Sequence, residues 1–143
     1  MKRLFLLLCL FGSAICTYAE LSITLNVETA GSLSTMIASS KQFEVTSLTL
    51  TGKLNGSDIS FIRYMAGAGY KGSSTEGQLN YLDISGADIV KGGRSYAYEH
   101  TLAAIGYTDK EYYTSDNTIT PFMFDDCWRL KTLILPNSVN TIE

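Results

Sequence analysis

The sequence predicts an α/β fold in which parallel strands and short helices build a solenoid. One pattern occurs three times: an apolar residue, two residues, Leu, one residue, Leu or Ile, one residue, then Gly or Asn. Its copies occupy 45–52, 79–86 and 130–137. Their starts are too far apart for hairpins, and helix-like sequence lies between them. Strand, helix and strand repeated in this order indicate a solenoid.

Each copy is expected to form a strand that ends in a turn. Residues two apart on a strand point to the same face, so the paired apolar residues of each copy should face the core. Gly and Asn tolerate a left-handed backbone and suit the following turn. The inward pairs are Leu48 and Leu50, Leu82 and Ile84, and Leu133 and Leu135.

The segments around these strands complete the architecture. Residues 20–44 are expected to cap the N-terminal end, with a strand in "LSITLNVE" and a short helix in "AGSLSTMIASSKQFEV". "SDISFIRYMAG" predicts a helix that Ser57 and Asp58 cap. "TPFMFDDCWRL" predicts a second helix that begins near Pro121.

The first residues, 1–19, are predicted to be a secretory signal peptide. Two basic residues precede an apolar run that is too short to span a bilayer, and Thr17 and Ala19 occupy the small-residue positions of a cleavage site. Cleavage after Ala19 leaves Cys127 as the single cysteine, so no intramolecular disulfide is expected. We therefore expect a secreted or cell-surface protein that has no membrane span after signal removal.

Composition limits the function classes. Of 143 residues, 45% are hydrophobic and 17% are charged, which indicates one globular domain rather than a disordered chain. The formal net charge of −3 offers no basic surface for phosphates, so no nucleic-acid partner is expected.

The stretch "ITPFMFDDCWRLKTLILPNSVNTI", 119–142, resembles the repeat of BspA-like leucine-rich-repeat proteins, which are secreted or surface proteins. That repeat reads roughly I-x-x-x-A-F-x-x-C-x-x-L-x-x-I-x-L-P-x-S-V-x-x-I. The resemblance implies a leucine-rich-repeat region over 45–143, with three divergent repeats and an insertion at 91–117. The matching positions are Ile119, Phe124, Cys127, Leu130, Leu133, Leu135, Pro136, Ser138, Val139 and Ile142.

The family pattern continues beyond the position at which this sequence stops, Glu143. The resemblance therefore implies the N-terminal part of a longer surface protein, or a short one whose open end at 133–142 associates with a partner or a second copy. Adhesion to a host surface or matrix protein is the function that it implies. We accordingly expect an exported, non-catalytic protein-binding module, and the alternative is a purely structural capping segment.

Tyrosines mark the candidate binding residues. The insertion 91–117 carries five of the nine tyrosines, and tyrosine gives a large amphipathic contact area at low entropic cost. The alternative is that these rings pack back onto the solenoid. Two further candidates are outward residues of the middle strand. The full candidate set is Tyr81, Asp83, Tyr96, Tyr98, Tyr107, Tyr112 and Tyr113.

Catalytic, cofactor and metal sites are not predicted. "GAGYKGSS", 67–74, has the glycine spacing of a dinucleotide loop, but a helix is expected before it and a strand after it, the reverse of the required order. An enzyme would have to use the single histidine, His100, and we keep this only as a third alternative. Cys127 occupies an inward position, where cysteine packs as a small hydrophobe.

Overall fold

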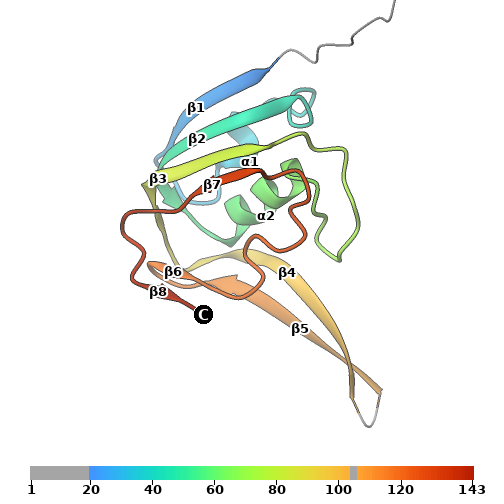
Figure 1. The fold of residues 1–143 in the computed structure, drawn as a ribbon. Helices are drawn as coiled ribbons and strands as arrows, with labels where there is room; N and C mark the ends of the chain where they lie inside the picture. Colours follow the sequence, from blue (N-terminus) through green and yellow to red (C-terminus); the bar gives the residue numbers. More distant parts are fainter. Residues whose placement is uncertain (1–19, 104–105) are drawn as a thin grey trace, which may run out of the picture.

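The computed structural model describes residues 20–103 and 106–143, and its largest element is a four-stranded parallel sheet (Figure 1). The predicted signal peptide lies outside the described residues. Two helices lie behind this sheet, and a long two-stranded hairpin projects from the body. The sheet has the order β1-β2-β3-β7 and consists of β1 (Leu21–Val27), β2 (Val45–Leu54), β3 (Tyr81–Ile89) and β7 (Thr132–Ile134).

The remaining elements lie on the helix side or at the end of the chain. The hairpin is antiparallel, and two short strands form a separate parallel pair. No helix within the described residues is long and apolar enough to cross a membrane. These elements are α1 (Leu33–Met36), α2 (Gly56–Met65), β4 (Gly92–Ala103), β5 (Gly106–Thr114), β6 (Thr118–Ile119) and β8 (Thr141–Ile142).

The three copies of the repeated pattern lie on neighbouring parallel strands, and the first inward leucine of each copy is aligned with that of the next. Leu48 lies beside Leu82, and Leu82 lies beside Leu133. β1 adds a strand at the other edge, where Ile23 is the neighbour of Leu48. Because the side chains of one face recur at every second residue, the inward residues form an apolar layer against which the helix residue Ile62 is fully buried.

The predicted leucine-rich-repeat solenoid of strands and short helices is wrong as the fold class. The chain is rich in strands and poor in helix, and it contains several separate sheets, one of them antiparallel. Among the described residues, α2 is the only helix longer than about one turn. Between β3 and β7 the chain forms a hairpin and turns instead of a helix, so the repeated unit of a solenoid is not present.

The helix predicted from Pro121 is also wrong, because residues 121–126 form turns. Phe122 and Asp126 have φ angles of 60° and 55°, a left-handed conformation that a right-handed helix does not contain. The buried side chain of Arg63 holds these turns: its Nη1 donates to the carbonyl oxygens of Phe122 and Asp125 at 2.5 and 2.7 Å. Both carbonyls therefore bond to α2, and that of Phe122 also accepts from the Asp125 amide at 3.3 Å.

The predicted insertion 91–117 consists mainly of the β4–β5 hairpin. Its base packs tightly against the start of α2, and glycine makes this approach possible. A Cβ on Gly56 would lie 2.1 Å from the carbonyl oxygen of Arg94, and one on Gly93 would lie 2.4 Å from Oδ1 of Asn55. Gly93 also has a φ of +71°, which side chains rarely adopt.

The helix predicted in "SDISFIRYMAG" is present as α2, but its cap is Asn55. The Oδ1 atom of Asn55 accepts from the Ser57 amide at 2.9 Å, and the carboxylate of Asp58 accepts from the Asn55 amide at 2.9 Å, which completes a capping box. Asp58 is buried and also accepts from the amides of Gly31 and Leu33 at 2.5 and 3.0 Å. One carboxylate therefore joins α2 to the segment before β2.

Candidate recognition surfaces

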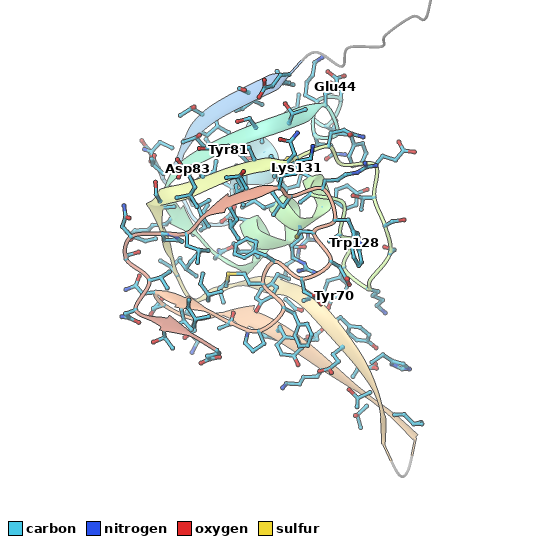
Figure 2. The ribbon with its side chains drawn as sticks, in the orientation of Figure 1. Glu44, Tyr70, Tyr81, Asp83, Trp128 and Lys131 are labelled. Carbon is cyan, nitrogen blue, oxygen red and sulfur yellow. The ribbon has the colours of Figure 1, made fainter. Side chains whose placement is uncertain are left out.

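One face of the parallel sheet is open to solvent, while α1 and α2 lie behind the other (Figures 1 and 2). Parallel sheets are usually covered on both faces, so this arrangement is unusual. Its outward side chains are small or polar except for Ile134, and they include one aromatic ring and one carboxylate. We call this surface the open face; it consists of Ser22, Thr24, Asn26, Ser47, Thr49, Thr51, Tyr81, Asp83, Ser85, Thr132 and Ile134.

Tyr81 and Asp83 lie near the centre of the open face, on β3 (Figure 2). Tyr81 is flanked by Ser47 on β2 and by Thr132 on β7. These small neighbours leave the ring and the carboxylate half-buried but accessible. Hydrogen bonds from the side chain and backbone of Ser85 lower the pKa of Asp83, so this carboxylate is charged at neutral pH. The pair offers an aromatic contact surface and a negative charge, surrounded by Ser and Thr hydroxyl groups.

Two of the candidate tyrosines belong to the core instead of the surface. Tyr96 is 0% exposed, and its hydroxyl donates to the Pro121 carbonyl at 2.7 Å; burial raises its pKa. Tyr112 is 7% exposed and packs on the ring of Phe122 at 4.7 Å. The prediction that Tyr96 and Tyr112 contact a partner is therefore corrected, because they anchor the hairpin to the body.

The other hairpin tyrosines lie near the surface. Tyr98 is half-buried and Tyr113 is exposed, while the side chain of Tyr107 lies outside the described residues. A hydrogen bond to the Asp109 carboxylate raises the pKa of Tyr98 to about 12. The sequence reasoning missed Tyr70, which comes from the loop after α2 and tilts against Tyr98 with ring centroids 6.1 Å apart.

His100 lies on β4, and its Nδ1 is 2.7 Å from Oδ1 of Asp109 on β5. Both side chains are about half exposed, so this pair belongs to the hairpin surface. Within the described ranges, no group of three or more His, Cys, Asp or Glu side chains is arranged to hold a metal ion.

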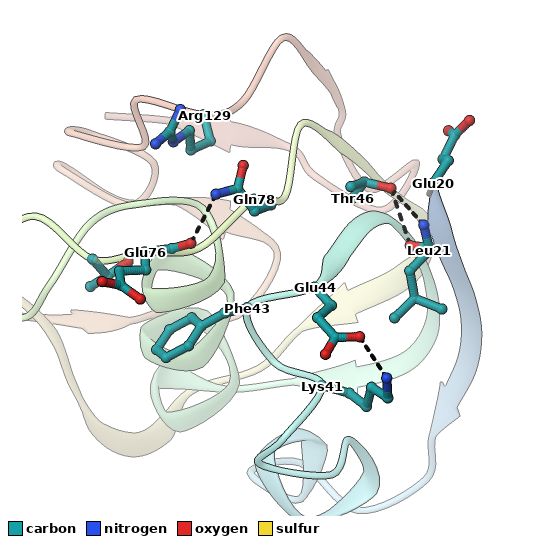
Figure 3. Close-up of a pocket in the computed structure, with 10 residues that line it drawn as sticks. Glu20, Leu21, Lys41, Phe43, Glu44, Thr46, Glu76, Gln78 and Arg129 are labelled. Atoms are coloured by element: carbon teal, nitrogen blue, oxygen red, sulfur yellow. Dashed lines mark hydrogen bonds and ion pairs between the residues drawn. The ribbon is translucent and has the colours of Figure 1, made fainter. Parts of the chain in front are cut away.

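A hollow of about 750 Å³ lies at the amino ends of the sheet strands (Figure 3). Phe43 contributes an aromatic side chain to its lining, and an ion pair of Lys41 and Glu44 at 2.6 Å lies along it. Gln78 and Arg129 extend the lining on the other side. No sequence pattern indicated this hollow, because its residues come from the separate segments that precede four strands.

Cys127 should be nearly unreactive in the folded protein. It is 9% exposed, and burial raises its pKa to about 11, whereas the thiolate is the reactive form. In a chain that begins at Glu20, we expect Ellman's reagent at pH 8 to label the native protein at least about a hundredfold more slowly than the urea-unfolded protein. Equal labelling rates would show that the thiol is not buried.

Comparisons with known proteins do not assign a family. No protein-family model matches the chain, and no curated protein is significantly similar to it. The resemblance to leucine-rich-repeat proteins therefore rests on the residues quoted above, chiefly 119–142.

Proposed function

We propose that the protein is an exported, non-catalytic recognition module that binds another protein through the open face of its parallel sheet. The observation that carries this proposal is the solvent exposure of one whole sheet face. An uncovered parallel sheet would normally expose apolar side chains. Here those positions hold Ser, Thr, Asn, Tyr and Asp, with Ile134 as the apolar exception, so the sequence keeps the face soluble without a covering layer.

The open face has the chemistry of a protein-binding surface. Its backbone is fixed by hydrogen bonds between strands, so a partner would have little backbone to order on binding. Tyrosine is enriched in interfaces, and Tyr81 stands beside the charged Asp83 among small residues. The four strands span about 20 Å, which suits a loop or an extended segment of a partner.

The sequence favours the export and the adhesive role that this proposal includes. The predicted signal peptide at 1–19 favours export, and the resemblance of 119–142 to BspA-like repeats favours adhesion to a host surface or matrix protein. Two observations favour the alternative of a structural capping segment. Tyr96 and Tyr112 are buried, and β7 is an edge strand that follows Trp128, which is 74% exposed. In that alternative, β7 receives a further repeat or a second copy.

The double variant Tyr81→Ala, Asp83→Asn tests the proposal. Both side chains point away from the core, so the variant should fold, while its retention on a surface coated with extracellular-matrix extract should fall at least about tenfold. Leu102→Ala, at an exposed position of the hairpin outside the open face, is the control and should keep the wild-type retention. Unchanged retention by the double variant would refute a role for the open face.

A further inference from the structure

A groove lies between the base of the hairpin and the loop that follows α2. It joins two hollows of about 400 and 360 Å³, which share Tyr70 and Arg94. Tyr113 and Glu111 line the first hollow, and Tyr64 of α2 lines the second. Figure 2 shows Tyr70 beside the hairpin, in the region where β4 begins to project. We call this site the arginine–tyrosine groove, defined by Tyr64, Tyr70, Arg94, Glu111 and Tyr113.

One carboxylate holds two of the rings that line the groove. The hydroxyl of Tyr70 donates to Oε1 of Glu111 at 2.8 Å, and the hydroxyl of Tyr113 donates to Oε2 at 2.5 Å. These bonds lower the pKa of Glu111, so it stays charged. Tyr113 is 50% exposed and Tyr64 is 40% exposed. The groove therefore presents aromatic surface to solvent, and two of its rings have fixed hydroxyl positions.

Arg94 adds an exposed cation at a fixed backbone position. Its amide donates to Oγ of Ser57 at 3.1 Å, and its carbonyl lies against Gly56. Among the residues that the structure describes, no carboxylate is within ion-pair distance of its guanidinium. The side chain is exposed, and its planar fork of N–H donors matches a carboxylate in a bidentate geometry.

We propose that the arginine–tyrosine groove binds a saccharide that carries a carboxylate, namely a uronic-acid unit. The carboxylate of the sugar pairs with Arg94. The C–H face of the pyranose ring packs on a tyrosine ring, and its hydroxyls donate to the lone pairs that Glu111 retains on each oxygen. A hollow of about 400 Å³ lies within the range of small-ligand sites.

A saccharide fits this groove better than an acidic peptide does. A peptide that adds as a strand needs free backbone groups, but around Arg94 the β4 amide is bonded to Ser57 and the carbonyl faces Gly56. An acidic side chain would pair with Arg94 yet leave the exposed faces of Tyr64 and Tyr113 uncovered.

The inference does not depend on the function proposed for the open face. The groove is formed by α2, its following loop and the hairpin, whereas the open face lies on the side of the sheet away from the helices (Figure 1). A ligand in the groove would leave Tyr81 and Asp83 accessible.

The test is a ¹H–¹⁵N NMR titration of the protein with tetragalacturonate. We expect saturable shifts at Tyr70, Arg94, Glu111 and Tyr113, and none at Tyr81. Arg94→Gln should raise the Kd at least about tenfold, and Tyr113→Ala should raise it as well. The matched control is Arg129→Gln, an exposed arginine in another hollow, which should bind as the wild type does.

Two further probes separate the sources of binding. Galactotetraose, which lacks carboxylates, should bind at least about tenfold more weakly, and hexaglutamate should not shift the tyrosine resonances. The proposal is overturned if tetragalacturonate gives no saturable shifts in the groove, if hexaglutamate binds equally well there, or if Arg94→Gln keeps the wild-type Kd. The first of these outcomes is measured on the wild-type protein. The proposal can therefore be refuted even if a variant fails to fold.

Discussion

Replacement of Asp58 with Ala should lower the free energy of unfolding by about 3–5 kcal/mol. The carboxylate is 1% exposed and accepts hydrogen bonds from the amides of Gly31, Leu33 and Asn55. Alanine would leave three amides without their acceptor and would remove half of the capping box of α2. The same change would weaken the attachment of the segment before β2, because Asp58 hydrogen-bonds this segment to the helix.

Urea denaturation checks this effect directly. Asp88→Ala is the control, since Asp88 is exposed on β3, and its change should stay within about 0.5 kcal/mol. The loss of unfolding free energy in Asp58→Asn should be intermediate, because the amide keeps one acceptor oxygen. A loss below about 1 kcal/mol in Asp58→Ala would contradict the role assigned to this carboxylate.

Replacement of Arg63 with Ala should lower the free energy of unfolding by about 2–4 kcal/mol. Arg63 is 4% exposed in the last turn of α2, where the helix dipole favours a cation. Its Nη1 is the donor that holds the carbonyls of Phe122 and Asp125. Without it, the Asp125 carbonyl would lose its bond to Arg63 and the Phe122 carbonyl would keep only the Asp125 amide at 3.3 Å. The turns at 121–126 would loosen, and the neighbouring Cys127 would become more accessible.

Two measurements separate this effect from a simple loss of packing. Urea denaturation gives the stability change, and labelling of Cys127 by Ellman's reagent should become at least about tenfold faster in Arg63→Ala. Arg63→Met keeps the apolar volume and loses only the donors, so it should also accelerate labelling. If Cys127 in both variants stayed as slow to react as in the wild type, Arg63 would not be the residue that fixes the turns.

The strands with the repeated pattern were predictable from the sequence, and the elements between β3 and β7 were not. In each copy of the pattern, apolar residues alternate with other residues around the inward leucine (Leu48, Leu82 or Leu133). This period of two indicates a strand even when its neighbours are unknown. The turns after Pro121 depend on Arg63, which lies 59 residues before Phe122 in the chain. A local pattern contains no information on such a contact, so the helical spacing of 120–130 was misleading.

Some residues of the candidate sites could likewise be predicted from the sequence, and others could not. Tyr81 and Asp83 follow from strand alternation alone, because the residues between inward leucines must point outward. Tyr96 could not be distinguished from Tyr98 by sequence, since its burial depends on the packing of the hairpin base against α2. The arginine–tyrosine groove was missed because Tyr70 and Glu111 are 41 residues apart and neither belongs to a motif.

Photo-cross-linking from the open face tests the central claim most directly. p-Benzoylphenylalanine in place of Tyr81 should form a covalent adduct with a protein of the matrix extract, whereas the same group in place of Leu102, exposed on the hairpin, should form none. An adduct from position 81 that excess unlabelled protein suppresses would place the partner on the open face. Retention on the matrix without any adduct from position 81, or with adducts from position 102 alone, would contradict recognition through this face.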